Sequence, residues 1–144
     1  MQRLHTAGFD RVLPQLEQPV LGICLGMQLL FAKLEEGQTN GLGVLDETVH
    51  RLDAAPGRPV PHMGWNRLQR LRDDPLLEGI TDDDYVYFVH SYAAPVSGWT
   101  VTATCYGAEF SSVVRCRNFW GAQFHPERSA EPGARLLENF LGLQ

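Results

Sequence analysis

The alternation of apolar and polar positions predicts the order of elements along the chain. Near its start, apolar residues recur at helical spacing at Leu4, Val12 and Leu16, with breaks at Gly8 and Pro14. This pattern predicts one broken amphipathic helix over the first eighteen residues.

A short apolar run at residues 20–24 predicts a buried strand, and the residues after it predict a helix. The helix is expected over residues 25–36, with Leu29 and Leu34 facing inward and Gly37 ending it. A strand followed directly by a helix is typical of an α/β fold.

The rest of the chain predicts mainly strands. Aromatic and β-branched residues dominate residues 85–92, which therefore predict a strand. Further strands are expected at the following ranges: 44–52, 62–71, 99–105, 109–117 and 119–124. Short turns with Gly and Asn separate the last three of these ranges, which favours an antiparallel extension of the sheet.

The end of the chain predicts a helix that covers a sheet. Ser129 is expected to cap it, and Leu136, Leu137, Phe140 and Leu141 form its apolar stripe. We therefore expect one α/β domain over residues 1–144, with a mixed, mostly parallel sheet flanked by helices. The three prolines and one glycine at residues 54–61 predict a surface connection and not a domain boundary.

Composition and charge exclude several classes of partner. The 144 residues are 44% hydrophobic and 20% charged, as in an ordinary soluble domain. A net charge of −5 with scattered basic residues argues against nucleic acid and anionic membranes. Three cysteines, an odd number without a C-x-x-C pair, favour a reducing compartment over disulfides or zinc. With no apolar run near ~18 residues and no signal peptide, we expect a cytoplasmic protein.

The most informative stretch is a cysteine between two glycines at the junction of the predicted strand and helix. Gly22, Cys24 and Gly26 have the spacing of a nucleophile elbow, in which the glycines give clearance at a sharp turn. A helix N-terminus favours the thiolate, and the Leu25 N–H would face a developing oxyanion. Gln28 lies on the same helical face. The alternative is a buried structural cysteine.

A second motif supplies the partners that a cysteine nucleophile needs. His125 and Glu127 follow a predicted strand two residues apart, so their side chains share one face. A histidine can carry the proton of Cys24, and a carboxylate can orient that histidine. The alternative is a histidine with a structural role in the turn before Pro126.

Together, residues 22–28 (GICLGMQ) and 121–127 (GAQFHPE) resemble the two signature blocks of class I glutamine amidotransferases. The resemblance implies a triad of Cys24, His125 and Glu127 that hydrolyses glutamine through a thioester. It implies neither a metal nor an organic cofactor.

The same resemblance implies the residues that bind the substrate. The Leu25 N–H would contribute to the oxyanion hole, and Gln28 would hold glutamine. His90, Ser91 and Tyr92, at the end of a predicted strand, would bind the amino-acid end of glutamine largely through backbone groups. Strand packing is the alternative for these three.

Within the class, residues 61–66 (PHMGWN) and 87–92 (YFVHSY) resemble the glutaminase subunits of imidazole glycerol phosphate synthases in histidine biosynthesis. This resemblance implies a heterodimer with a cyclase subunit, a (β/α)8 barrel. Met63 and Trp65 would line the partner face, unless they pack in the core. Arg128, where the family commonly has Lys, keeps the positive charge but changes its geometry.

Family members begin with further strands and a glycine-rich loop that supplies a second oxyanion donor, and this sequence starts after them. We therefore expect an N-terminally truncated chain with weak activity. Its alternative is an inactive remnant that keeps the partner surface. A cysteine hydrolase or stress protein of similar architecture is the third hypothesis, but it has no need of Gln28 or of the motif at 125–127.

Overall fold

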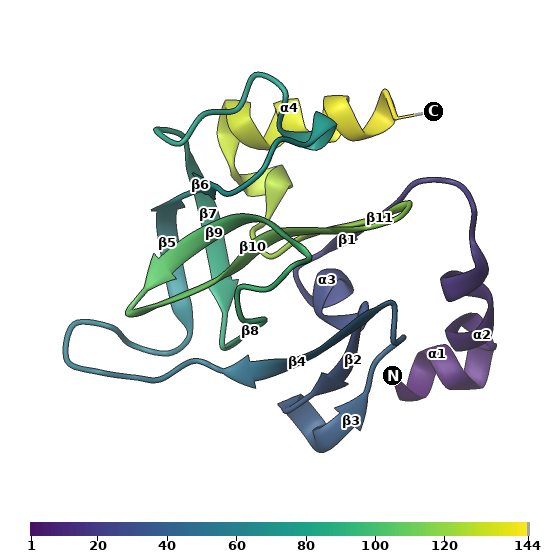
Figure 1. Ribbon diagram of the computed structural model, residues 1–144. Coiled ribbons are helices and arrows are strands. Elements are labelled where there is room, and N and C mark those ends of the chain that lie inside the picture. Colours follow the sequence, from purple (N-terminus) through teal and green to yellow (C-terminus); the bar gives the residue numbers. More distant parts are fainter. Residues whose placement is uncertain (144) are drawn as a thin grey trace.

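The computed structural model describes residues 1–143 and arranges them around a five-stranded sheet (Figure 1). The helices are α1 (Gln2–Ala7), α2 (Phe9–Val12), α3 (Leu25–Leu29) and α4 (Ala130–Leu141). Single turns of 3₁₀-helix occur at Leu13–Gln15, Glu36–Gln38, Pro75–Leu77 and Pro126–Arg128. The first six strands are β1 (Val20–Ile23), β2 (Phe31–Leu34), β3 (Thr39–Asn40), β4 (Leu45–Arg51), β5 (His62–Arg67) and β6 (Gln69–Arg70). The others are β7 (Tyr85–His90), β8 (Tyr92–Ala93), β9 (Thr100–Tyr106), β10 (Ala108–Cys116) and β11 (Phe119–Ala122).

The strands form mixed sheets, which confirms the predicted α/β class. The central sheet has the order β1-β11-β10-β9-β6, a second has β3-β2-β4-β8, and β5 pairs with β7. Within residues 1–143 only β1–β11 and β2–β4 are parallel, fewer than predicted. The reason is that β9, β10 and β11 follow one another through short turns, which permit only antiparallel pairing.

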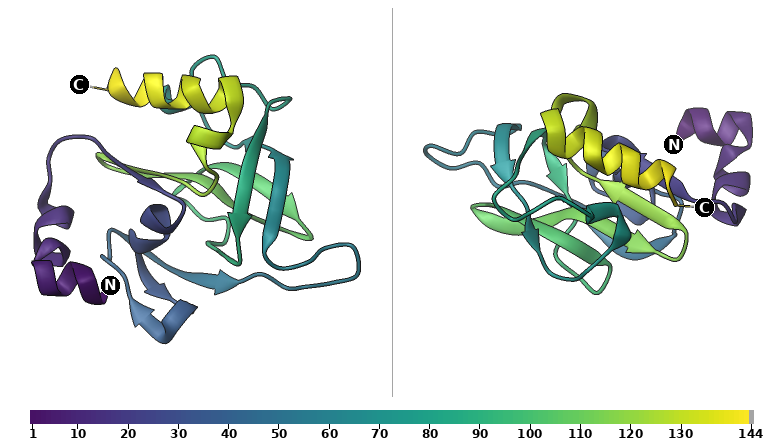
Figure 2. Two further views of the ribbon diagram at one scale, coloured as in Figure 1. Left: turned by 180° about the vertical axis from the view of Figure 1, so that it is seen from behind. Right: turned by 90° about the horizontal axis from the view of Figure 1, so that it is seen from above.

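Apolar side chains fill both faces of the central sheet. Neighbouring residues of β11 point to opposite sides, so Trp120 packs in the cluster under α4 while Phe119 packs in the cluster around α3. Leu136 of α4 is fully buried in the first cluster, and Met27 of α3 is fully buried in the second. The two clusters place α4 on one face and α3 with the second sheet on the other (Figures 1 and 2).

The predicted helix over residues 25–36 is wrong in its second half. The helix α3 ends at Leu29, and Phe31 and Leu34 belong to the strand β2. That strand pairs in parallel with β4, and both side chains are buried in the cluster around α3. Long-range pairing therefore overrides the local helical pattern. Gly37 lies in a turn with φ of 69°.

The helical segments at the two ends of the chain lie where they were predicted, but their burial and capping differ from the prediction. The first segment breaks at Gly8, whose φ of 73° ends α1, and neither α1 nor α2 buries a residue. The predicted apolar stripe of α4 is narrower than expected, because Leu141 at its end is 75% exposed. Ser129 precedes α4 but makes no side-chain cap. Its hydroxyl instead donates to the His125 carbonyl and accepts from the Tyr87 N–H.

The strands predicted at 85–92, 99–105, 109–117 and 119–124 are confirmed as β7 with β8, β9, β10 and β11. Residues 54–61 form the predicted surface connection, which projects from the sheets (Figure 1). Within residues 1–143, no helix has the length and apolar character to cross a membrane.

Candidate active site

The predicted elbow is present at the junction of β1 and α3. Cys24 has φ of 50° and ψ of −107°, a backbone conformation that non-glycine residues rarely adopt and that clusters at functional sites. Its N–H donates to the Ala122 carbonyl at 2.7 Å, so the cysteine is tied to the end of β11. A Cβ on Gly22 would lie 2.5 Å from the Gly26 carbonyl oxygen, which confirms the need for glycine there. At Gly26 a Cβ would meet no atom of residues 1–143 within 4 Å outside its chain neighbours and the backbone of its own helix, so the expected clearance role is wrong at that position.

The surroundings of the Cys24 sulfur favour the thiol, not the predicted thiolate. Burial raises the pKa of Cys24 above its ordinary 9.0, and the charges of Glu127 and Glu36 raise it further. The Leu25 N–H lowers this pKa by less than burial raises it but by more than either carboxylate does, and the Gln123 side chain, whose Nε2 lies 3.7 Å from the sulfur, lowers it least. The helix α3 has only five residues, so its dipole is small. Cys24 is therefore protonated at neutral pH.

A pocket of about 380 Å³ opens beside Cys24. Its walls come from the elbow and from the junction of β7 and β8, two segments more than sixty residues apart. It is lined by Cys24, Leu25, Gln28, Glu36, Pro61, Val89, His90, Ser91 and Tyr92. The structure thus brings together every residue predicted to bind substrate. The sequence did not predict that Glu36, Pro61 and Val89 line the pocket. A continuous helix over residues 25–36 would not bring Glu36 near Cys24, so the incorrect helix explains why Glu36 was missed.

Gln28 lines this pocket, and hydrogen bonds within the protein hold its side chain. The side chain is 4% exposed, and its Nε2 donates to the Tyr92 carbonyl at 2.9 Å and to Gln123 Oε1 at 3.1 Å. Both amide protons are therefore used within the protein, and its oxygen remains as an acceptor for a ligand. Gln123 was also missed, although it belongs to the block at residues 121–127.

His125 and Glu127 come from the segment after β11. The His125 Nδ1 and Glu127 Oε1 lie 2.8 Å apart, and the His125 N–H donates to the Tyr87 carbonyl at 2.9 Å. Within residues 1–143 no hydrogen bond joins His125 to Cys24. Glu127 is nevertheless close enough for its charge to raise the pKa of Cys24. Catalytic contacts are often loose before substrate binds, so this geometry is compatible with a triad.

The three residues predicted to face a partner form one exposed surface. Met63 and Trp65 on β5 are 63% and 52% exposed, so core packing is excluded for both. The Trp65 and Tyr87 rings pack in a T-shaped arrangement with their centroids 5.8 Å apart, and the Arg128 guanidinium lies 4.6 Å from the centroid of the Tyr87 ring. This aromatic and cationic surface adjoins His125 through Tyr87.

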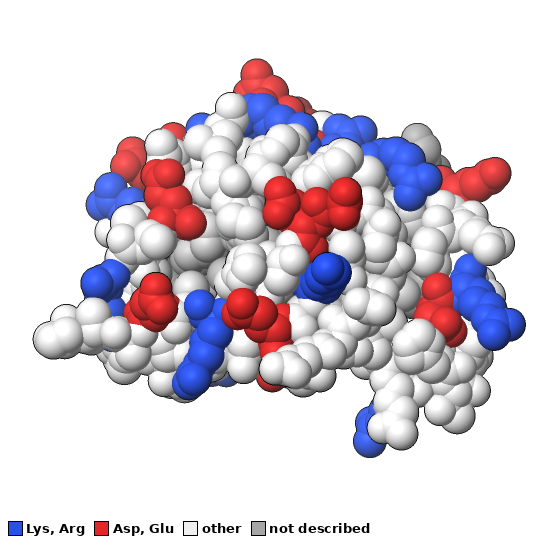
Figure 3. All heavy atoms as spheres, turned by 60° about the horizontal axis from the view of Figure 1, so that its bottom comes forward, with Lys and Arg blue, Asp and Glu red and all other residues white. Residues whose placement is uncertain are grey.

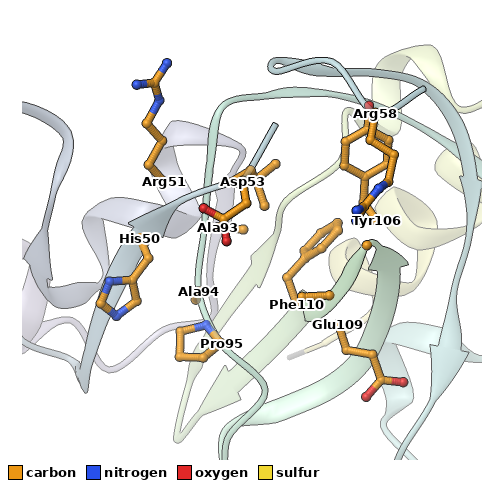
Figure 4. A pocket seen from close by; sticks show the side chains of 13 residues that line it. His50, Arg51, Asp53, Arg58, Ala93, Ala94, Pro95, Tyr106, Glu109 and Phe110 are labelled. Atoms are coloured by element: carbon orange, nitrogen blue, oxygen red, sulfur yellow. The ribbon is translucent and has the colours of Figure 1, made fainter. Parts of the chain in front are cut away.

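Other features of the surface are less suited to this chemistry. A second pocket of about 370 Å³, between β4, β8 and β10, contains Arg58, Tyr106 and Phe110 but none of the predicted site residues (Figure 4). Within residues 1–143, no three His, Cys, Asp or Glu side chains gather as a metal-ligand set. Acidic and basic groups are interspersed on the face of the molecule in Figure 3, which does not resemble a nucleic-acid-binding surface.

Cys24 at the elbow lies beside Gln28 and the end of β7, and the His125–Glu127 pair follows β11, the strand that neighbours β1 in the sheet. This combination defines a class of enzyme. Residues 6–143 match the family "Glutamine amidotransferase class-I", and the chain belongs to this family. Its curated relatives include imidazole glycerol phosphate synthase subunits HisH. The subunits of Xanthomonas campestris (strain 8004) and Xylella fastidiosa (strain Temecula1) are each 52% identical over 98% of this chain and 70% of their own length.

Solved structures support the fold alone, because their sequence identity is low. A Thermoplasma acidophilum protein described as a GMP synthase subunit superposes with a TM-score of 0.70 at 17% identity, over 95% of this chain. A glutamine amidotransferase of Thermotoga maritima superposes with a TM-score of 0.61 at 18% identity, over 96% of this chain. This chain spans 62% and 53% of the length of those two structures.

Proposed function

We propose that this chain is the glutaminase subunit of a cytoplasmic imidazole glycerol phosphate synthase in histidine biosynthesis. It hydrolyses glutamine and passes the ammonia to a cyclase subunit, with which it forms a heterodimer. The HisH relatives support the biological role. The observation that carries the chemistry is the strained backbone of Cys24 in the pocket that also contains Gln28 and Tyr92.

In the proposed reaction the Cys24 sulfur attacks the side-chain amide carbon of glutamine. His125, oriented by Glu127, accepts the thiol proton and returns it to the departing ammonia. The Leu25 N–H stabilises the oxyanion of the tetrahedral intermediate. Water then attacks the thioester carbonyl carbon, and His125 takes a proton from this water and passes it to the Cys24 sulfur as glutamate leaves.

The pocket offers complementary groups for the charged end of glutamine. Gln28 presents its oxygen to the pocket, and Glu36 adds a negative charge to its lining, so both suit the ammonium group. His90, Ser91 and Tyr92 also line the pocket, and we assign their backbone groups to the carboxylate end of glutamine. These contacts need neither a metal nor a cofactor.

The test compares the cysteines of the chain with one another. Cys24→Ala, assayed with the cyclase partner, is expected to lose all measurable release of glutamate. Cys105→Ala is the matched control, because Cys105 is exposed and outside the pocket, and it is expected to retain the full rate. Hydrolysis by Cys24→Ala at the rate of the unaltered chain would refute the proposal.

The proposed partner surface is tested separately. Trp65→Ala and Arg128→Ala are each expected to weaken cyclase binding by about tenfold or more, as aromatic and arginine residues at the centre of interfaces do. Leu141→Ala is the control, since Leu141 is also exposed but lies at the far end of α4 (Figure 1). Equal affinities for all three variants would place the interface elsewhere.

A further inference from the structure

Two buried histidines face each other across the β5–β7 ladder. His62 and His90 are directly opposite in the antiparallel register and are 3% and 5% exposed. The His62 Nδ1 lies 3.0 Å from the His90 Nε2. Two imidazoles can share such a contact only if one nitrogen donates and the other accepts, so the position of each proton matters.

The neighbours of the pair determine where those protons lie. His90 Nδ1 is 2.8 Å from the Tyr92 carbonyl oxygen, which can only accept, so this nitrogen carries the proton. Burial lowers the pKa of both histidines to about 4, so both rings are neutral at pH 7. The His90 Nε2 is therefore an acceptor, and the His62 Nδ1 must donate to it.

An aromatic cage holds the two rings in place. His62 is stacked between Phe88, at 4.9 Å, and Tyr106, at 4.0 Å. Phe110 lies 4.9 Å from His90, and Figure 4 shows Tyr106 and Phe110 side by side at the wall of the neighbouring pocket. Because the cage fixes the planes of both imidazole rings, the directions of their hydrogen bonds are fixed as well.

The chain of bonds ends at the candidate active site. The Tyr92 carbonyl that accepts from His90 also accepts from Gln28 Nε2, at 2.9 Å. At its other end, His62 belongs to β5, whose opposite face exposes Met63 and Trp65. The bonds therefore connect the exposed strand with the amide that faces the glutamine pocket.

We infer that His62 is a positioning residue for glutamine binding, acting through His90 and the Tyr92 carbonyl on the orientation of Gln28. This inference rests on the proposed glutaminase function. Without the His62 donor, the His90 Nε2 loses its hydrogen-bond partner, and the ring keeps only its bond to the Tyr92 carbonyl. The Tyr92 carbonyl then no longer holds Gln28 in one orientation.

The experiment compares two replacements of similar size in the chain with its cyclase partner. His62→Asn keeps an N–H donor near the position of Nδ1, whereas His62→Leu removes it. His62→Leu is expected to raise the KM for glutamine about tenfold with a smaller change in kcat, as the loss of one buried hydrogen bond implies. His62→Asn is expected to stay within about twofold of the unaltered chain. His50→Asn, at an exposed histidine, is the control.

A second measurement does not depend on activity or on the folding of a variant. Two-bond ¹H–¹⁵N spectra of the unaltered chain at pH 7 are expected to show Nδ1–H tautomers for both His62 and His90. An Nε2–H tautomer at either residue, or equal KM values for His62→Leu and His62→Asn, would overturn the inference. Failure of the proposed function would look different, because the unaltered chain with its partner would then release no glutamate.

Discussion

The two glycines of the elbow provide a sharp test of the local geometry. A Cβ at Gly22 would lie 2.5 to 2.7 Å from three backbone atoms, namely the carbonyl oxygen and carbon of Gly26 and the nitrogen of Met27. Backbone atoms cannot move aside as a flexible side chain can, so Gly22→Ala must shift β1 against α3. Overpacking of this kind costs about 3 kcal/mol of unfolding free energy.

Gly26→Ala is the matched comparison, since within residues 1–143 the same methyl group would meet nothing within 4 Å beyond its chain neighbours and its own helix backbone. Alanine inside a helix is favoured over glycine by about 0.5–1 kcal/mol, so this variant is expected to be at least as stable as the unaltered chain.

Urea denaturation followed by tryptophan fluorescence measures the difference. With a slope of about 2 kcal/mol per molar urea, a loss of about 3 kcal/mol lowers the midpoint of Gly22→Ala by about 1.5 M. Coinciding midpoints for Gly22→Ala and Gly26→Ala would show that the close approach at the elbow does not exist, and the strained turn at Cys24 would lose its structural basis.

Three further predictions concern buried charge and the candidate triad. Asp74→Ala is expected to lower the free energy of unfolding by about 2–4 kcal/mol in urea denaturation, because donors on Leu76, Trp120 and Arg115 would lose the carboxylate that accepts from them. The control Asp73→Ala, at an exposed residue, is expected to change it by less than about 0.5 kcal/mol. Glutamate release is expected to fall about 10³-fold in His125→Ala and less in Glu127→Gln, which keeps the base; equal, negligible losses would contradict a triad. Because the pKa of Cys24 is raised, its thiolate fraction is small at pH 7, so its alkylation by iodoacetamide is expected to accelerate with pH beyond pH 9. Glu127→Gln should increase that alkylation rate at a given pH; an unchanged profile, measured by mass spectrometry of the Cys24 peptide, would show that Glu127 does not act on the sulfur.

The parts of the site that could be predicted are those that depend on a few neighbouring residues. The close approach at Gly22 and the turn at Cys24 involve only residues 22–27, so an apolar run broken between two glycines was enough to place the turn. The segment at 31–34 had no such restriction, since four residues can satisfy a helical or an extended pattern equally well. Its state is decided by pairing with β4, from which ten residues separate it.

Among the contacts inside the pocket, too, the local ones could be predicted from the sequence and the long-range ones could not. Gln28 could be placed near Cys24 because both lie within one turn of backbone. The bonds from Gln28 to Tyr92 and Gln123 join residues 64 and 95 positions apart, and no local pattern contains them. The pair of His62 and His90 is equally nonlocal, because it depends on the register of two strands.

The charge state of Cys24 illustrates why a motif alone can mislead about chemistry. A helix N-terminus favours the thiolate, but that influence is weak for a five-residue helix. Burial and the carboxylates of Glu127 and Glu36 act in the opposite direction and prevail. The sulfur is therefore a poor nucleophile until His125 accepts its proton, and no bond between Cys24 and His125 exists within residues 1–143. In the proposed mechanism, Cys24 consequently becomes reactive only when His125 comes within hydrogen-bonding distance of its thiol. The rate of glutamine hydrolysis therefore depends more on the distance between these two side chains than on the charge of Cys24 before substrate binds.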